Sequence, residues 1–288
     1  MKNVLYIINP ISGVGKQKTI EKLLAKYSDT TKITYKIIYT ERAKHAIEIS
    51  KQEAANFDAI VSVGGDGSVN EVAQALINTE TALGIIPTGS GNGFARHIKL
   101  PLKLNKAIQR INNFKIEAVD VVKVNNVFAV NVVGIGFDAL ITHKFAEFGK
   151  RGFSSYIKLT TKEFSKFKGV ETSVEIDDKK LETNVFLFTV ANGSQYGNNA
   201  YIAPKASIQD GLLDISILKK FPLISAPNLA YRLFTRKFDK FKYSEIYKAK
   251  SIKIIQKGEI QAQIDGEPFL FNDEIKINVL EKALKIIV

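Results

Sequence analysis

Hydrophobic residues in the first 120 positions form short apolar runs that alternate with segments of helical spacing. The apolar runs, which predict buried strands, are 4–8, 33–39, 59–63 and 83–86. The segments with apolar residues three or four positions apart, which predict helices, are 17–27, 43–54, 69–77, 92–97 and 104–112. Strands that alternate with helices along the chain are typical of an α/β domain built on a parallel sheet.

Beyond residue 120 the pattern changes to strands that follow one another directly. Two hairpins are predicted, with turns at Asn125-Asn126 and Asp177-Asp178. The predicted strands of this half are 121–124, 127–133, 172–176, 183–191, 212–218, 251–256, 260–264 and 275–280, and the two helical segments are 154–168 and 223–238. A chain of 288 residues is long for a single core, so we expect two domains, 1–120 and 121–282.

The composition excludes several classes of protein. No segment approaches the run of about 18 apolar residues that a membrane-spanning helix needs. The apolar run at the N-terminus is too short for a signal peptide, so we interpret it as the first strand. The chain has no cysteine, which excludes disulfides and thiolate metal sites and is consistent with a cytoplasmic protein.

One glycine-rich loop stands out, at the junction of the predicted strand 59–63 and the predicted helix 69–77. It reads Gly64-Gly65-Asp66-Gly67-Ser68. Glycine lets the backbone approach a ligand closely, and amides at a helix N-terminus bind phosphate oxygens. A carboxylate in such a loop would repel phosphate unless a divalent cation lies between them. The loop therefore predicts a site for a nucleotide with Mg²⁺.

A purely structural role for the same loop is the alternative. Ser68 and Glu71 stand three residues apart at a helix start, which is the spacing of a capping box. Gly-Asp-Gly also occurs in ordinary turns.

Two further strand-to-helix loops favour the nucleotide interpretation. The first begins at Asn9-Pro10; it lacks the Walker pattern, because Gln17 stands where Ser or Thr should follow Gly15-Lys16. The second is the small-residue turn 87–93. All three loops would lie at the C-terminal edge of one parallel sheet, where open α/β sheets bind ligands.

The three loops together resemble the diacylglycerol/sphingosine lipid kinase family, and its bacterial soluble members in particular. The motifs are Asn-Pro-x-Ser-Gly at 9–13, Gly-Gly-Asp-Gly-Ser-x-Asn-Glu at 64–71 and Thr-Gly-Ser-Gly-Asn-x-Phe-Ala-Arg at 88–96. Gly-Gly-Asp-Gly alone is shared with NAD kinases and 6-phosphofructokinases, so the specificity lies in the set and its order. The resemblance covers essentially the whole chain.

The resemblance implies a Rossmann-like parallel sheet of the phosphofructokinase and NAD kinase type, then a C-terminal β-sandwich, with 283–288 returning to the first domain. It implies that ATP and Mg²⁺ bind at the three loops, with Asp66 also taking part in catalysis. The implied nucleotide-binding residues are Asn9, Pro10, Ser12, Gly13, Thr40, Gly64, Gly65, Asp66, Gly67, Ser68, Asn70, Glu71, Thr88, Ser90 and Asn92.

Two acidic loops in the second half carry further candidates. Phosphorylation of a hydroxyl needs a carboxylate to accept its proton, and the resemblance assigns this role to Glu267, with Asp265 assisting. The alternative is a plain Asp-Gly hairpin turn. At 207–214 the resemblance implies a second Mg²⁺, held by Ser207, Asp210 and the carbonyl of Leu212; the alternative is again a turn before a strand.

A second glycine motif, Gly134-x-Gly136-x-x-Ala139, matches the dinucleotide-binding fingerprint. It lies in the β-rich half, with no second βαβ unit after it, and the resembled kinases carry a similar segment. We interpret it as packing between the domains.

The net charge of +12 and the isoelectric point near 9.5 require a partner or a solvated face. Lys and Arg alternate with aromatic residues in 144–168, with seven cations against two Glu, and in 232–242, with five against one Asp. Such segments suit an anionic membrane surface, where cations meet head groups and rings insert. They also suit nucleic acid; a lipid acceptor favours the membrane, and no nucleic-acid partner is expected.

These observations predict an ATP-dependent lipid kinase that contacts the membrane peripherally and phosphorylates a lipid hydroxyl such as that of diacylglycerol. The third loop reads Thr-Gly-Ser-Gly-Asn, which is closer to sphingoid and ceramide kinases, so the acceptor stays open. NAD kinase-like chemistry is another alternative, and a nucleotide-sensing or nucleic-acid-binding regulator is the non-enzymatic one. The oligomeric state is open, with a homodimer as one option.

Overall fold

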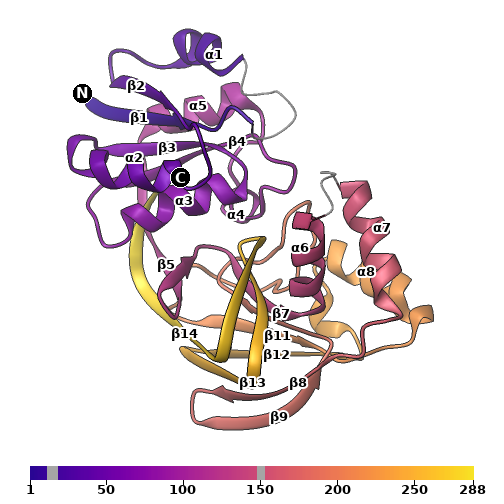
Figure 1. The fold of residues 1–288 in the computed structure, drawn as a ribbon. Coiled ribbons are helices and arrows are strands. Elements are labelled where there is room, and N and C mark those ends of the chain that lie inside the picture. The colour runs from indigo at the N-terminus through magenta and orange to yellow at the C-terminus, as the bar shows by residue number, and fades with distance from the viewer. Residues whose placement is uncertain (12–18, 148–152) are drawn as a thin grey trace. The chain divides into compact units, whose positions relative to one another are not determined.

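The computed structural model describes residues 1–11, 19–147 and 153–288, apart from the side chains of 153–157. The chain divides into two compact units (Figure 1). Unit 1 contains Met1–Asp120 together with Glu281–Val288, and unit 2 contains Val121–Leu280.

Unit 1 is an α/β domain with a parallel sheet, as the alternation of strands and helices predicts. Its strands are β1 (Lys2–Ile8), β2 (Ile33–Tyr39), β3 (Ala59–Gly64) and β4 (Ala82–Pro87), in the order β4-β3-β1-β2. Its helices are α1 (Ile20–Tyr27), α2 (His45–Glu53), α3 (Asp66–Leu76), α4 (Gly93–His97) and α5 (Leu104–Asn113), with a 3-10 turn η2 at Ala54–Asn56. The end of the chain adds to this sheet, because Ile286 pairs with Leu83 of β4 in parallel.

Helices cover both faces of this sheet, which explains why β3 and β4 are apolar and buried along their whole length. Ile20 and Leu24 of α1 and Ile108 and Ile111 of α5 pack with alternate strand residues such as Tyr6 on one face. On the other face α2 and α3 pack against each other, and α3 lies against β3 (Figure 1).

Unit 2 is dominated by antiparallel strands. The strands are β5 (Ile116–Val124, which enters from unit 1), β6 (Val127–Ala129), β7 (Val132–Gly136), β8 (Val170–Ile176), β9 (Lys179–Val185), β10 (Leu187–Ala191), β11 (Leu213–Leu218), β12 (Ser244–Ala249), β13 (Ser251–Ile264) and β14 (Glu267–Ile287, which continues into unit 1). The helical elements are α6 (Phe137–Glu147), α7 (Phe153–Phe164), α8 (Ala226–Phe234) and the 3-10 turns η3 (Leu223–Ser225) and η4 (Phe238–Lys240). The strand order within this unit is β12-β11-β10-β7-β13-β14, and β8-β9 and β5-β6 join at β13 and β14.

Two apolar clusters fill unit 2. One lies among the strands and contains residues such as Phe188, Ile215 and Ile254. The other joins the strands to α6, α7 and α8 through a group of aromatic rings, in which Phe137 stacks on Phe186 with centroids 4.6 Å apart.

Several elements differ from the prediction for physical reasons. The expected strand 127–133 is interrupted at residues 130 and 131, because the amides there donate to the carboxylate of Asp265, in the turn between β13 and β14. The expected strands 251–256 and 260–264 are one strand, β13, which carries an irregularity between Ile255 and Glu259. Strand β12 and helix α6 were not predicted at all.

The glycines of 134–139 serve packing inside unit 2. A Cβ at Gly134 would lie 1.9 Å from Asp138 Oδ2, and Gly136 has a φ of +90°. Asp138, in the first turn of α6, is buried; its Oδ2 accepts hydrogen bonds from Tyr196 Oη at 3.2 Å and Gln263 Nε2 at 3.4 Å. The segment therefore holds a buried carboxylate, and the contacts described for Asp138 lie within unit 2. Packing of this segment between the domains stays a prediction.

Burial raises the pKa of Asp138 from its ordinary value of 3.8 to about 7. Between about pH 4 and 7 the Asp138 carboxyl therefore stays protonated in the folded protein, whereas it ionises in the unfolded chain. Stability from this group is complete below pH 4 and is lost as the pH rises toward 7.

The variant Asp138→Asn cannot ionise, so we expect its unfolding free energy to fall less between pH 5 and 8 than that of the wild type. The difference should be on the order of a few kcal/mol, since each pKa unit corresponds to about 1.4 kcal/mol. Urea unfolding of both proteins at the two pH values measures it. Parallel pH profiles would show that Asp138 is ionised in the native protein.

Candidate functional site

The glycine turns after β3 and β4 lie in direct backbone contact in unit 1. Thr88 N donates to Gly64 O at 2.8 Å. A Cβ on Gly89 would lie 2.6 Å from Gly65 Cα, and one on Gly65 would lie 3.2 Å from Gly89 Cα. Only residues without a side chain allow this approach, which places the N-termini of α3 and α4 beside each other.

Asp66 is the first residue of α3, and Gly65 is its N-cap. Helix α3 therefore begins three residues earlier than predicted, and the carboxylate lies in its first turn, where the helix dipole favours a negative charge. Asp66 Oδ1 accepts a hydrogen bond from Phe94 N at 3.4 Å, which joins α3 to α4. The side chain is half-buried at the point where the two turns meet.

The capping-box alternative for Ser68 and Glu71 is wrong. Ser68 lies inside α3, and its Oγ accepts a hydrogen bond from Asn9 Nδ2 at 3.3 Å. Glu71 Oε1 accepts from Lys44 N at 3.0 Å, at the start of α2. These two side chains connect α3 to neighbouring loops instead of capping it.

The first loop joins the same group. Asn9 N donates to Val63 O at 3.3 Å, and Asn9 Oδ1 accepts from Ile11 N at 3.1 Å. Thr40 is buried, and its amide donates to Ile8 O at 2.9 Å, so the end of β2 lies beside the end of β1. The predicted ligands Ser12 and Gly13 lie outside the described residues.

The third loop contributes one unsatisfied oxygen. Asn92 has a φ of +50°, and its Nδ2 donates to Gly89 O at 2.7 Å. Its Oδ1 is buried, and no hydrogen-bond donor among the described residues reaches it. Thr88 is buried, Ser90 is exposed, and Arg96 Nε donates to Gly91 O at 3.0 Å, which stabilises the loop itself.

The other predicted ligands in α3 occupy different environments. Gly67 is half-buried in the first turn, and Asn70 is buried with its Oδ1 accepting from Gln74 Nε2 at 2.6 Å. The described part of the three loops thus offers backbone amides at two helix N-termini, one carboxylate and one orphaned acceptor. Such a set fits phosphate groups accompanied by a hydrated cation.

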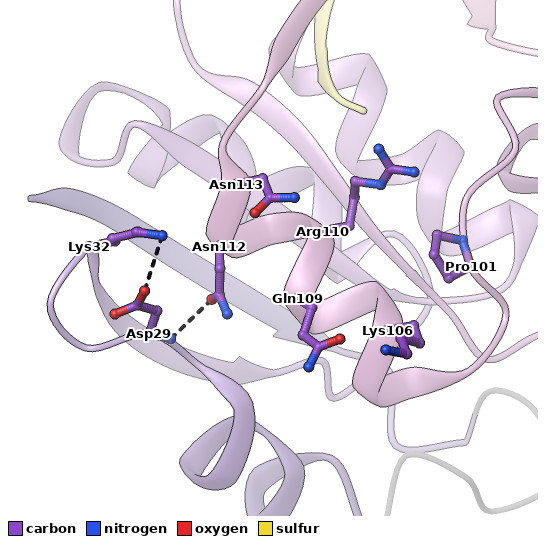
Figure 2. A pocket seen from close by; sticks show the side chains of 8 residues that line it. All are labelled: Asp29, Lys32, Pro101, Lys106, Gln109, Arg110, Asn112 and Asn113. Carbon is purple, nitrogen blue, oxygen red and sulfur yellow. Dashed lines mark hydrogen bonds and ion pairs between the residues drawn. The ribbon is translucent and has the colours of Figure 1, made fainter.

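A surface hollow of about 430 Å³ lies elsewhere in unit 1 (Figure 2). Its lining residues are Asp29, Lys32, Pro101, Lys106, Gln109, Arg110, Asn112 and Asn113, and none of these is a predicted site residue. Asp29 forms an ion pair with Lys32 at 3.3 Å, and its amide donates to Asn112 Oδ1 (Figure 2). The hydrogen bond from Asp29 to Asn112 joins α5 to the turn before β2. The residues that line the hollow do not form a recognisable catalytic arrangement.

In unit 2, Asp265 and Gly266 form the turn between β13 and β14, with φ values of +50° and +88°. The Asp265 carboxylate is buried and accepts three backbone hydrogen bonds, from Val130 N at 2.8 Å, Asn131 N at 3.0 Å and Val132 N at 2.9 Å. Both sequence interpretations are compatible with this turn, because Asp265 anchors it and Glu267, at the start of β14, is exposed.

Two side chains that the sequence did not indicate support this hairpin. Gln263 Oε1 accepts from Gly266 N at 2.9 Å, while its Nε2 donates to Asp138. His143 Nε2, from α6, lies 3.2 Å from Ala262 O and 3.1 Å from Phe269 O, one on each strand. Gln263 is one of several polar residues in β13, so its position carried no distinct signal in the sequence.

The ammonium group of Lys248 lies beside the predicted metal-binding loop 207–212. Asp210 Oδ2 accepts from Lys248 Nζ at 2.7 Å, and its Oδ1 accepts from Leu212 N at 3.2 Å. Ser207 Oγ accepts from Gln209 N. The structure described for this chain contains no metal-like cluster of three or more His, Cys, Asp or Glu side chains. With the Lys248 ammonium group beside Asp210, these residues do not fit a divalent cation as they stand.

Many aromatic rings of the basic segments 144–168 and 232–242 pack inside unit 2, where we predicted contact with a membrane. Phe145, Phe164, Phe167, Phe238 and Phe241 all pack in the apolar cluster under the helices of unit 2. In 232–242 the exposed ring is that of Phe234. Phe148, Lys150 and Arg151 lie outside the described residues, as do the side chains of Phe153 and Tyr156.

No helix in the ranges that the structure describes is long and apolar enough to cross a membrane.

Two family models match the chain. Residues 3–124 match a diacylglycerol kinase catalytic domain, and residues 131–288 match a YegS C-terminal NAD kinase beta sandwich-like domain. The predicted fold class, an α/β domain followed by a β-sandwich domain, is confirmed.

Several known proteins are similar over most of their length. The diacylglycerol kinase of Bacillus subtilis is 28% identical over 274 residues, which cover 93% of this chain and 90% of that protein. A protein named as a lipid kinase in Staphylococcus haemolyticus is 30% identical over 261 residues, with 87% and 81% covered.

Solved structures share the fold. The crystal structure of a diacylglycerol kinase from Bacillus anthracis has a TM-score of 0.77 at 23% identity, covering 99% of this chain and 96% of that one. An NAD kinase from Archaeoglobus fulgidus, solved in complex with ATP, has a TM-score of 0.52 at 16% identity and covers 99% and 93%.

The variant Gly89→Ala tests the contact between the two turns. Its Cβ would meet the backbone of Gly65, so the turns must separate, and we expect a loss of about 1–3 kcal/mol in unfolding free energy. The neighbouring Ser90→Ala change, at an exposed position, is the matched control and should leave stability unchanged. Thermal unfolding of both variants measures the effect, and a Gly89→Ala protein as stable as the control would contradict the contact.

Proposed function

The chain belongs to the diacylglycerol kinase family of lipid kinases, and from this premise we propose that it transfers the γ-phosphate of ATP to a hydroxyl group of a membrane lipid such as diacylglycerol. The observation that carries the proposal is the pair of glycine turns in backbone contact, with Asp66 at the N-terminus of α3 between them. Amides at the start of α3 and α4 bind the phosphate oxygens, and no side chain intrudes at Gly65 or Gly89.

Several side chains of unit 1 complete the nucleotide site. Asp66 would hold Mg²⁺, directly or through its water shell, and the cation would supply neutralising charge beside the phosphates. The orphaned Asn92 Oδ1 accepts a hydrogen bond from a hydroxyl group or from a metal-bound water. Asn9 and Ser68, which bond each other, fix the first loop beside α3.

Glu267 of unit 2 accepts the proton of the acceptor hydroxyl. The hydroxyl oxygen attacks the γ-phosphorus, the bond from the γ-phosphorus to the β-γ bridging oxygen breaks, and ADP leaves. Asp265, held by three amides, keeps the turn in place and does not itself need to exchange protons. An exposed carboxylate on an anchored turn suits a group that must meet a substrate.

The acceptor is a lipid, so the protein works at a membrane surface, and the basic side chains of unit 2 favour an anionic one. A sphingoid base or ceramide would offer a similar hydroxyl group. This proposal for peripheral contact at the cytoplasmic side rests on the excess of positive charge, +12 over the chain.

Transfer of labelled phosphate from ATP to a panel of acceptors in neutral mixed micelles tests the reaction. The panel contains diacylglycerol, sphingosine, ceramide and, as a soluble acceptor, NAD. We expect label in a lipid, and a fall of at least about 100-fold in kcat/KM for Asp66→Ala, since one lost electrostatic contact of this kind costs on the order of a few kcal/mol.

Asp29→Ala removes a half-buried carboxylate at the hollow of Figure 2 and should keep full activity. Label confined to NAD, or full activity of Asp66→Ala, would contradict the proposal.

The acidic turn makes a separable prediction. Glu267→Gln keeps the shape of an exposed side chain, so we expect an unchanged melting temperature and a kcat lower by about 10²–10⁴-fold, the usual contribution of positioned proton transfer. Asp265→Asn loses charge-assisted bonds to buried amides, so its unfolding free energy should fall by about 1–3 kcal/mol.

Measuring kcat and melting temperature for both variants separates the two roles. A Glu267→Gln enzyme with the kcat of the wild type would remove Glu267 from the mechanism.

A further inference from the structure

A group of large apolar side chains is exposed on η3 and α8 of unit 2. Ile224 is 89% exposed, Leu223 62%, Tyr231 58% and Phe234 48%. They belong to two consecutive elements. Ile224 and Tyr231 are seven positions apart, Tyr231 and Phe234 three, and Leu223 and Phe234 eleven, and these helical spacings bring the four side chains to one side of the helical segment. We call Leu223, Ile224, Tyr231 and Phe234 the η3–α8 surface.

Helix α8 has a second apolar side that accounts for its folding. Ala226, Leu229 and Leu233 pack against the helix-covered apolar cluster of unit 2. These three residues are half-buried and attach α8 to the domain, whereas the opposite apolar side takes no part in the core. Exposed apolar groups of this size mark sites of interaction.

The surface is held firmly by its flanks. Phe221 before η3 and Phe238 after α8 are buried. Lys220 Nζ donates to Phe164 O at 2.7 Å and Phe167 O at 2.6 Å, which ties the segment to the end of α7. Figure 1 shows α7 and α8 together on unit 2, and both helices contribute side chains to the same apolar cluster.

The charge around the surface is positive. The cations that follow Tyr231 are Arg232, Arg236, Lys237, Lys240 and Lys242. Within the described chain none of these five forms an ion pair with a carboxylate, and the single acid among them, Asp239, pairs with Lys205 at 3.0 Å. Arg236 Nη2 donates a hydrogen bond to Tyr201 Oη. This bond fixes the position of the guanidinium group without neutralising its charge.

We infer that the η3–α8 surface is the part of unit 2 that docks on an anionic lipid bilayer. Leu223 and Ile224 enter the boundary between head groups and acyl chains, and Tyr231 and Phe234 lie at the interface. The flanking cations contact the lipid phosphates. The inference deepens the proposed function, on which its choice of partner rests.

The chemistry favours a bilayer over the other occupants. Nucleic-acid bases stack on aromatic rings and pair with polar groups, whereas the most exposed members here are aliphatic. A bilayer uses both features at once, because its surface is anionic and its interior is apolar.

Sedimentation with vesicles tests the inference on the full chain. Vesicles of phosphatidylcholine alone and of phosphatidylcholine with phosphatidylglycerol are compared, at low and high salt. The double variant Leu223→Glu/Ile224→Glu should bind anionic vesicles at least about tenfold more weakly, because two inserted side chains become charged. The triple variant Lys237→Gln/Lys240→Gln/Lys242→Gln should lose the preference for anionic vesicles and most of the salt dependence.

Ile116→Glu, at a 40% exposed apolar residue of unit 1, is the matched control and should bind as the wild type does. Circular dichroism establishes that each variant is folded. Equal vesicle binding by the wild type and the double variant would overturn the inference, as would a wild type that binds no vesicles. A dimer that the double variant abolishes, with vesicle binding unchanged, would also overturn it and assign the surface to a second copy.

The vesicle assay needs no turnover, so it is independent of the proposed reaction. A wild type that phosphorylates lipid in neutral micelles while the double variant keeps its vesicle binding would overturn this inference alone. Vesicle binding that depends on the surface, without phosphate transfer to any lipid, would overturn the proposed function alone.

Discussion

The approach of Gly65 to Gly89 is the constraint on which the organisation of unit 1 depends. Parallel strands end at one edge of the sheet, but side chains normally keep the loops that follow them apart. Here a Cβ at Gly89 would stand 2.6 Å from the neighbouring backbone. The absence of both side chains brings two helix N-termini together and allows Asp66 to accept a hydrogen bond from Phe94 N. The amides in the first turn of a helix have no partner within the helix, so they can bind phosphate.

In unit 2 the buried carboxylate of Asp265 is the corresponding constraint. A charge away from water is costly unless it is hydrogen-bonded, and Asp265 satisfies this condition with three amides from one segment. Those amides cannot pair in a strand, so β6 and β7 separate, and the β13–β14 turn is fixed against the break. Gln263 and His143 reinforce the same turn, which leaves Glu267 exposed and positioned.

The sequence indicated most of unit 1, because apolar periodicity and glycine turns are local signals. It could not place the break at 130 and 131, since Val130 is a good strand residue and the acceptor, Asp265, is 135 positions from Val130 and 134 from Asn131. It could not show that Lys248 lies beside Asp210, or that Phe238 is buried while Phe234 is exposed. These outcomes depend on long-range packing, as does the role of Asn9 in bonding Ser68. The roles of Asp66, Glu267 and the other site residues stay predictions.

The location of the nucleotide is the central claim, and amide hydrogen exchange tests it most directly. The exchange of the full chain is compared without ligand and with ATP and Mg²⁺. The account predicts slower exchange in peptides that contain residues 64–68 and 88–93, with less change in the peptides of the hollow in Figure 2. Protection confined to the hollow, or no protection of the two glycine turns at saturating nucleotide, would contradict it.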